Sequence, residues 1–167
     1  ETCCAEVRRT TTEEVWNDIQ QAKGQFPAKE QSGTVAKIHQ ELQVALNEMF
    51  FANLLVLVEG LEDSAYLTAY MQLAGKWDEF RRTGGHIVPA NGKQHMIQAL
   101  AIAKRLDIPT FVVFDADGHV EKESARKKHE IDNLCLQTLA GMAKPTAFPA
   151  ETLWERNLTM WNTEIGK

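Results

Sequence analysis

The order of apolar runs is the feature that most constrains how this chain can fold. Residues 54–58 are five consecutive apolar residues, and a second expected strand, 110–114, follows Pro109 and has four consecutive apolar residues after Thr110. Such short, unbroken runs are typical of strands that are buried on both faces of a sheet. A shorter candidate strand, 86–89, lies between them, and helical apolar spacing separates all three. The β-α-β-α-β order predicts a parallel sheet with right-handed crossovers.

Further elements are expected on both sides of this unit. Thr11 and Glu14 have the spacing of a capping box, which predicts a helix that ends near Gly24. The other expected elements are a loop at 24–34, an amphipathic helix at 35–52, a long helix from about 121 to 139, a loop at 143–152 and a fourth strand at 158–161.

We therefore expect an α/β fold with a Rossmann-like, parallel, four-stranded sheet flanked by helices. A helical segment at 1–53 would precede the sheet domain at 54–167. The chain starts at Glu1 and stops at Lys167, directly after an apolar and aromatic run. This leads us to expect a fragment of a larger protein that is truncated on its C-terminal side.

Composition limits the possible partners and the setting. The net charge of −5 argues against a protein that holds nucleic acid by bulk positive charge, but not against phosphate binding through metal ions. The three cysteines have no spacing typical of a zinc site or a disulfide framework. No apolar run approaches 18 residues and no signal peptide is visible, so we expect a cytoplasmic protein without a membrane span.

Carboxylates follow two of the expected strands. Glu59 comes directly after the first strand, and Asp115 and Asp117 end the third. Ligands of open parallel sheets bind beyond the carboxyl ends of the strands, so these residues should meet at one edge. Residues two apart in an extended segment point the same way, which would align Asp115 with Asp117. Asp63, in the first turn of the next helix, could face the same crevice.

A group of carboxylates in one crevice needs a positive charge to hold it together. Oxygen-only ligands suit Mg²⁺, Mn²⁺ or Ca²⁺ better than zinc, and such ions support phosphoryl chemistry. Taken singly, Asp117 before Gly118 is also ordinary turn chemistry, and Asp63 could only complement a helix dipole. The joint placement at the strand ends favours a metal site.

Basic residues near this edge are weaker candidates. Lys93 follows the second strand, where it could contact a phosphate of DNA or be a loop lysine in solvent. The cluster Arg126 to Lys128 is interpreted as a solvated helix face, with contact to a DNA backbone as the alternative. His119, next to the acidic motif, is a weaker candidate metal ligand.

The acidic motifs resemble those of a known domain family. Leu57-Val58-Glu59-Gly60 and Asp115-Ala116-Asp117-Gly118, in this order, are similar to the Toprim domain of topoisomerases, bacterial primases, RecR-like repair proteins and OLD-family nucleases. The resemblance covers residues 54–118 and the possible fourth strand. The spacing Glu59-Gly60-x-x-Asp63, and a linker helix at 46–52 that leads into the strand, resemble the OLD (overcoming lysogenization defect) nucleases in particular.

This resemblance implies a DNA endonuclease that uses two metal ions and acts within a larger ATPase-nuclease. It implies Mg²⁺ (or Mn²⁺ or Ca²⁺) as cofactor, ATP only through a domain absent from this chain, DNA as partner and homodimerisation through the full-length protein. It also implies a basic catalytic residue beyond Lys167, so the isolated chain should cut weakly or not at all. By resemblance the catalytic residues are Glu59, Asp115 and Asp117, and the metal ligands are Glu59, Asp63, Asp115, Asp117 and Glu164.

Three alternatives stay open. The chain could be a non-catalytic module that binds metal or DNA or dimerises, or the Toprim domain of a topoisomerase or primase-like protein. A topoisomerase needs a nucleophilic tyrosine, yet Tyr66 and Tyr70 are expected within a helix, away from the acidic edge. A phosphotransfer receiver or a phosphatase is the third alternative. A receiver needs an acidic pair at the first strand, where this chain has the single Glu59.

Overall fold

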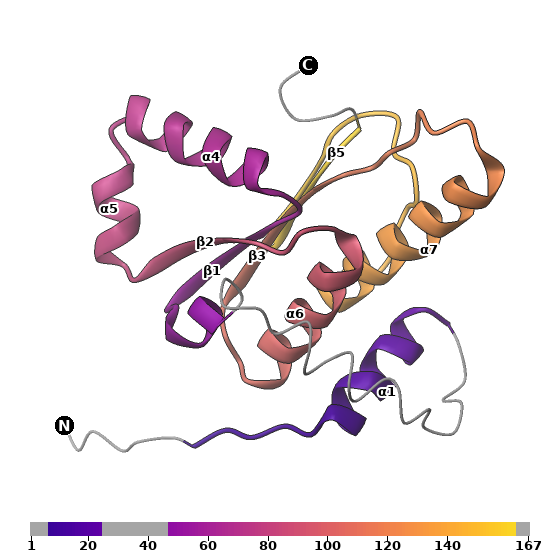
Figure 1. Cartoon of the computed structure of the whole chain (residues 1–167), viewed down its shortest axis with the longest axis horizontal. Coiled ribbons are helices and arrows are strands. Elements are labelled where there is room, and N and C mark those ends of the chain that lie inside the picture. Colours follow the sequence, from indigo (N-terminus) through magenta and orange to yellow (C-terminus); the bar gives the residue numbers. More distant parts are fainter. Residues whose placement is uncertain (1–6, 25–46, 163–167) are drawn as a thin grey trace.

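The computed structural model describes residues 7–24 and 47–162. A five-stranded sheet forms its centre, with the strand order β2-β1-β3-β5-β4 (Figure 1). The strands are β1 (Leu54–Val58), β2 (Gly85–Pro89), β3 (Thr110–Asp115), β4 (Leu153–Glu155) and β5 (Leu158–Trp161). The helices are α1 (Thr12–Ala22), the 3-10 turn η1 (Glu48–Phe51), α4 (Leu61–Leu73), α5 (Trp77–Arg82), α6 (Lys93–Arg105) and α7 (Glu123–Leu139).

Four of the strands form the expected parallel sheet. β1 pairs in parallel with β2 on one side and with β3 on the other, and β3 pairs in parallel with β5. The α/β class and the parallel core are thus confirmed. The expected number of four strands is wrong, because β4 adds a short antiparallel edge beside β5. β4 has only three residues and includes the polar Glu155, so no apolar run in the sequence predicts this strand.

Helices cover the two faces of the sheet unequally. α6, α7 and α1 lie on one face, and α4 and α5 lie on the other, near β1 and β2 (Figure 1). The main hydrophobic cluster forms between the sheet and the first group of helices. Its members alternate along the strands, since every second strand residue faces α6 and α7. Among the strand residues these are Leu55, Leu57, Val88, Val112, Phe114, Leu158 and Met160.

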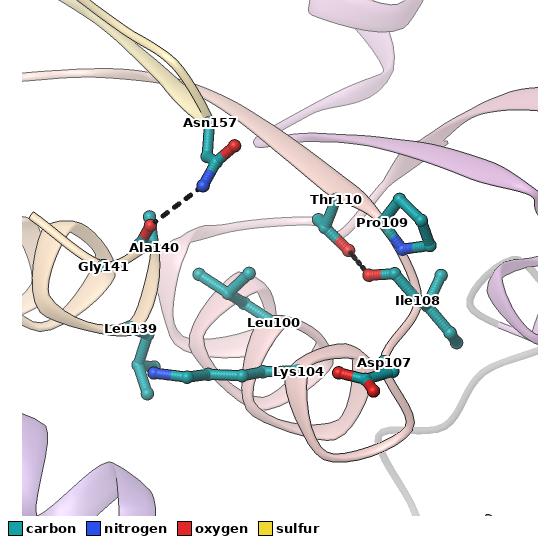
Figure 2. A pocket seen from close by; sticks show the side chains of 10 residues that line it. All are labelled: Leu100, Lys104, Asp107, Ile108, Pro109, Thr110, Leu139, Ala140, Gly141 and Asn157. Atoms are coloured by element: carbon teal, nitrogen blue, oxygen red, sulfur yellow. Dashed lines mark hydrogen bonds between the residues drawn. The ribbon is translucent and has the colours of Figure 1, made fainter.

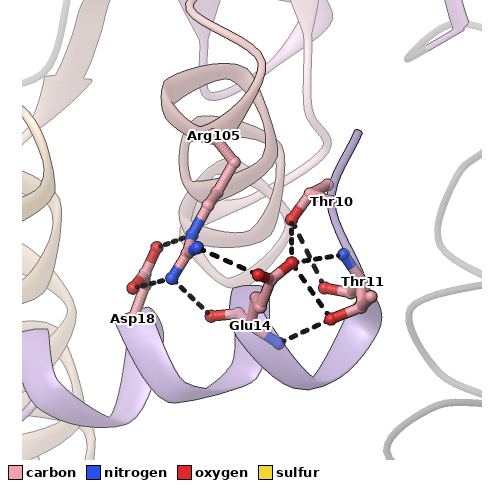
Figure 3. A network of polar contacts seen from close by, with 5 residues as sticks. All are labelled: Thr10, Thr11, Glu14, Asp18 and Arg105. Atoms are coloured by element: carbon pink, nitrogen blue, oxygen red, sulfur yellow. Dashed lines mark hydrogen bonds and ion pairs between the residues drawn. The ribbon is translucent and has the colours of Figure 1, made fainter. Parts of the chain in front are cut away.

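α1 is attached to this same core. Its capping box forms as expected: the Glu14 amide donates to the Thr11 side chain, and the Thr11 amide donates to the Glu14 carboxylate. Val15 and Ile19 are buried in the main cluster. Arg105 at the end of α6 donates two hydrogen bonds of 2.6 and 2.7 Å to the Asp18 carboxylate (Figure 3). The helix is therefore packed on α6 by apolar burial and by a charged pair.

Other expectations had different outcomes. The helix expected at 35–52 lies largely outside the described residues, and its described end is the turn η1, which buries Met49 in the core. The loop expected at 24–34 lies outside them beyond Gly24. The short helix α5 was not expected. No helix within 7–24 or 47–162 is long and apolar enough to cross a membrane.

Candidate functional site

Two adjacent central strands place the candidate carboxylates. β1 and β3 are neighbours and run in parallel, so Glu59, directly after β1, and Asp115, the last residue of β3, lie at the same edge. The amide of Ala116 donates to the Trp161 carbonyl oxygen at 2.7 Å. This bond continues the β3–β5 pairing past Asp115 and fixes the start of the Asp115–Gly118 segment.

Glu59 is the most perturbed acid of the site. Its pKa is raised to about 7, chiefly by burial; Lys93 lowers it, and the charges of Asp117, Asp115 and Asp63 contribute to the rise. Its buried Oε2 atom has no hydrogen-bond partner within the described part of the chain. A buried carboxylate oxygen without a partner is costly, so such an atom calls for a bound ion, a proton or a ligand.

Asp117 projects toward the helices α6 and α7. Its Oδ2 atom lies 2.5 Å from Lys93 Nζ and 3.0 Å from His129 Nδ1. The expectation that Asp115 and Asp117 lie in one extended segment is wrong, because Asp117 has a φ of +55°. This left-handed conformation, which Asp tolerates better than most residues, turns the chain after Ala116.

Lys93 is part of the site and not a loop lysine in solvent. It is the first residue of α6, and only 3% of its side chain is exposed. The Gly92 amide donates to the Glu59 carbonyl oxygen at 2.9 Å, which ties the start of α6 to the end of β1. The ammonium group also lies 5.7 Å from the centre of the Phe114 ring. Backbone pairing and burial thus hold Lys93 beside the acidic edge.

Asp63 has a structural partner of its own. Its Oδ2 atom accepts a 2.8 Å hydrogen bond from the Gly60 amide at the start of α4. Burial raises the pKa of Asp63, and this hydrogen bond partly opposes the rise. The carboxylate therefore contributes to the field at Glu59 while it caps the helix.

His129 is the residue that sequence reasoning missed. It lies on α7, 3.0 Å from Asp117 and 3.5 Å from Lys93. It follows the cluster Arg126 to Lys128, which was interpreted as a solvated face. The helical period could have indicated it. His129 precedes the buried residues Asp132 and Asn133 by one helical turn, so it lies on the same face of α7. Since α7 starts at the carboxyl edge of the sheet, its first buried turn faces the acidic residues.

A cavity of about 490 Å³ extends from the acidic edge between α6 and α7. Its lining joins Glu59 to the start of α6 and to the first turns of α7, and includes Lys93, His95, Lys128, His129 and Asp132. Asp132 is buried and accepts a 2.5 Å hydrogen bond from the Gln94 side chain. The lining thus combines the carboxyl groups of Glu59 and Asp132 with the ammonium groups of Lys93 and Lys128.

A second cavity lies at the other end of the sheet. It measures about 370 Å³ and is lined by residues around the start of β3 and the ends of α6 and α7 (Figure 2). Asp107 is the only carboxylate among the described residues that line it, and Lys104 and Leu139 are also part of the lining. Because this edge holds the amino ends of the parallel strands, it lacks the arrangement that ligand sites of such sheets use.

The carboxylate oxygens at the acidic edge are the kind of ligand that hard divalent cations prefer. One of these carboxylates has a buried oxygen without a hydrogen-bond partner in the described part. Yet within residues 7–24 and 47–162, no three His, Cys, Asp or Glu side chains are grouped as a ready-made metal centre. The contacts explain this, since Lys93 and His129 engage Asp117 and the Gly60 amide engages Asp63. Glu164 lies outside the described residues.

Comparison with known proteins agrees with the geometry of this edge. Residues 50–117 match the family model described as "Overcoming lysogenization defect protein-like, TOPRIM domain". The matched range starts in η1, includes β1, β2 and β3, and ends at Asp117. Neither the curated proteins nor the solved structures give a match.

Proposed function

Residues 50–117 form an OLD-like Toprim domain, a fold of metal-binding nucleases and primases, and from this premise we propose that the chain is the nuclease module of a larger ATP-coupled enzyme. Its substrate would be DNA and its reaction the hydrolysis of a phosphodiester bond. The observation that supports this most is Glu59, a buried carboxylate among other acids at the carboxyl ends of β1 and β3. This is where open parallel sheets bind ligands.

We assign roles to the residues according to their contacts. Glu59 and Asp115 would be metal ligands, with Asp117 as a third once its carboxylate is available. Asp63 and Glu164 complete the proposed set. Bound divalent ions would supply an activated water and stabilise the leaving oxygen. Glu59 is also suited to accept a proton at neutral pH, because its pKa of about 7 matches the preference of a general base.

The cofactor and partners follow from the same chemistry. Mg²⁺ fits hard oxygen ligands and leaves positions for phosphate oxygens, and Mn²⁺ or Ca²⁺ can bind the same donors. Lys93 would contact a phosphate of the DNA strand. ATP would act only through a separate domain, and a homodimer would form through the full-length protein. We place the protein in the cytoplasm.

Nicking of supercoiled plasmid in Mg²⁺ or Mn²⁺ tests the proposal. The assay should use both this chain and a longer protein that contains it. We expect Asp117→Asn to lower the rate of nicking by the longer protein by about 100-fold or more, the scale on which one stabilising group acts in catalysis. Asp107→Asn is a matched control, because Asp107 also has a φ of +55° but lies at the opposite edge. If Asp117→Asn nicked plasmid as fast as Asp107→Asn and the unmodified protein, the proposed site would be wrong.

A non-catalytic module is the second candidate. The ion pair between Lys93 and Asp117 favours it, because the described residues then need no metal to neutralise Asp117. This candidate predicts that DNA or metal binds without cleavage in every length of protein tested. A titration with Mn²⁺ and the nicking assay on the same sample separate the two.

A further inference from the structure

Lys93 occupies an unusual position for a lysine. Its side chain is 3% exposed, whereas lysines are almost never fully buried unless they are paired. Its ammonium group contacts Asp117 at 2.5 Å and lies 3.5 Å from His129. It also lowers the pKa of Glu59. The charge of Lys93 therefore serves the same carboxylates that would hold a divalent ion.

A divalent ion at Asp117 and the ammonium group of Lys93 cannot share this position. Both would bind the carboxylate of Asp117, whose Oδ2 atom Lys93 already contacts, and two cations so close together repel each other strongly away from bulk water. The ammonium group would have to move, while the backbone directly before Lys93 is held by the hydrogen bond from the Gly92 amide to the Glu59 carbonyl oxygen. Only the end of the side chain can change position.

The cavity between α6 and α7 is where the displaced ammonium group can go. Lys93 already lines it, together with Lys128, His129 and His95. Two carboxylates line this cavity, but Glu59 is a proposed metal ligand, and Asp132 already accepts from Gln94 and lies 4.0 Å from Lys23. A further cation therefore needs another anion beside it, since an unpaired buried charge is costly. A phosphate of the substrate strand has the charge and the oxygen acceptors to be that anion.

Resting on the proposed function, we propose that Lys93 is an internal substitute for the metal at Asp117, and that metal binding transfers it to a substrate phosphate in the α6–α7 cavity. The metal and the phosphodiester then bind cooperatively. Metal alone must displace Lys93 without giving it a partner, and phosphate alone must draw Lys93 away from Asp117. Together they satisfy all the charges, and the coupling is reciprocal by linkage.

Mn²⁺ binding to the 167-residue chain tests this, with unbound Mn²⁺ followed by electron paramagnetic resonance. The probe is a thymidine dinucleotide, which has one anionic phosphodiester. We expect the dinucleotide to tighten Mn²⁺ binding by about tenfold, within the usual range of coupling between sites. The same dinucleotide with a neutral methylphosphonate linkage should have no effect. Equal Mn²⁺ affinity with and without the anionic dinucleotide would overturn the inference.

Variants of Lys93 locate the coupling. Lys93→Met should bind Mn²⁺ more tightly than the unmodified chain in the absence of dinucleotide, and should lose the tightening by dinucleotide. Lys93→Arg, which keeps the charge, should retain a part of the coupling. Lys104→Met is the matched control, since Lys104 is an exposed lysine at the other end of α6. Coupling that persists unchanged in a folded Lys93→Met protein would contradict the proposal.

The inference and the proposed function fail in different ways. Coupled binding with no nicking in any length of protein would leave Lys93 in its role and refute the nuclease. Nicking without coupled binding would leave the nuclease and refute the role of Lys93. Circular dichroism and the unfolding midpoint of each variant show whether it is folded before its affinity is compared.

Discussion

At the scale of single residues, burial decides what Glu59 can do. The folded pKa of about 7 lies above the ordinary value of 4.5. Between these two values, the folded protein without metal binds more protons than the unfolded chain. The contribution of Glu59 to the free energy of unfolding therefore falls as the pH rises from about 4.5 to about 7, and a shift of this size corresponds to about 3 kcal/mol.

Glu59→Gln should remove this pH dependence. The amide has nearly the same shape and no charge, so at pH 8 in EDTA we expect the variant to be more stable than the unmodified chain by about 2–3 kcal/mol. At pH 4 the two should differ little. Urea unfolding at both pH values measures the difference, and Glu62→Gln, on the exposed side of α4, is the control. Parallel pH profiles for the Glu59 variant and the unmodified chain would contradict the prediction.

The sequence predicted some site residues and not others for a clear reason. Glu59, Asp115 and Asp117 follow apolar strands, and the strand-end rule places them without any knowledge of packing. The contacts of Lys93 and His129 depend on which faces of α6 and α7 are turned toward the sheet. The basic residues 126–128 make the start of α7 look like a solvated helix, so the sequence does not indicate that His129 faces the site. The φ of Asp117 depends on the turn that follows β3, and the alternation rule for extended chains does not apply there.

At the scale of elements, α7 supports the acidic segment through buried amides. Asn133 donates hydrogen bonds to the carbonyl oxygens of Ala116 (2.7 Å) and Ala147 (2.9 Å). Gln137, one turn later, donates to the Thr146 carbonyl oxygen and accepts from the Thr146 amide. Asn133 holds Ala116, which lies between Asp115 and Asp117. The two side chains also hold the loop that precedes β4. A helix thus determines the conformation of a segment at a strand end.

Asn133→Ala should therefore destabilise the fold and disturb the site together. One buried and one partly buried carbonyl group would lose their donor, so we expect a loss of about 2–4 kcal/mol in the free energy of unfolding. Mn²⁺ affinity should also fall, because Ala116 is no longer held. Lys127→Ala, on the exposed face of the same helix, should change stability by less than about 0.5 kcal/mol. Full stability and unchanged Mn²⁺ affinity in Asn133→Ala would show that α7 does not support the acidic segment.

Predictability differs among the elements for physical reasons. β1 and β3 each contain an unbroken apolar run, because both are inner strands of the sheet, with α6 on one face and α4 against β1 on the other. Such runs were identified correctly. β4 pairs on one side only and exposes 67% of Trp154, so its composition resembles a loop. α5 has six residues and buries only Phe80, which is too short for a helical period to show.

At the scale of the whole molecule, α1 and the sheet domain share one core. Val15 and Ile19 join residues of β1, β3, β5, α6 and α7 in a single cluster, although α1 lies far from them in the sequence. The sequence predicted the helix and its cap but not its position. Long-range packing of this kind leaves no local pattern, because an apolar stripe shows that a helix is buried and not where.

The attachment of α1 can be measured. Ile19 is 4% exposed. The substitution Ile19→Ala should therefore lower the free energy of unfolding by about 2–4 kcal/mol, as is usual for buried aliphatic residues. Arg105→Ala removes the ion pair with Asp18, which is partly exposed, and should cost about 1 kcal/mol or less. Urea unfolding of each variant, monitored by a signal from the sheet and analysed as a single transition, measures both losses of free energy. If Ile19→Ala left the unfolding of the sheet unchanged, α1 would not belong to its core.

The position of Trp161 gives the molecule a built-in optical reporter. Trp161 pairs with Asp115 across the β3–β5 ladder, and its indole ring meets that of Trp154 edge to face at 5.3 Å between centres. Indole emission depends on the local electric field, so a charge that arrives at Asp115 should shift the colour or intensity of this pair. The other two tryptophans, Trp16 and Trp77, lie on α1 and α5 and can be changed to Phe to leave the pair alone. Ligand occupancy at the acidic edge then becomes visible in fluorescence without any added label.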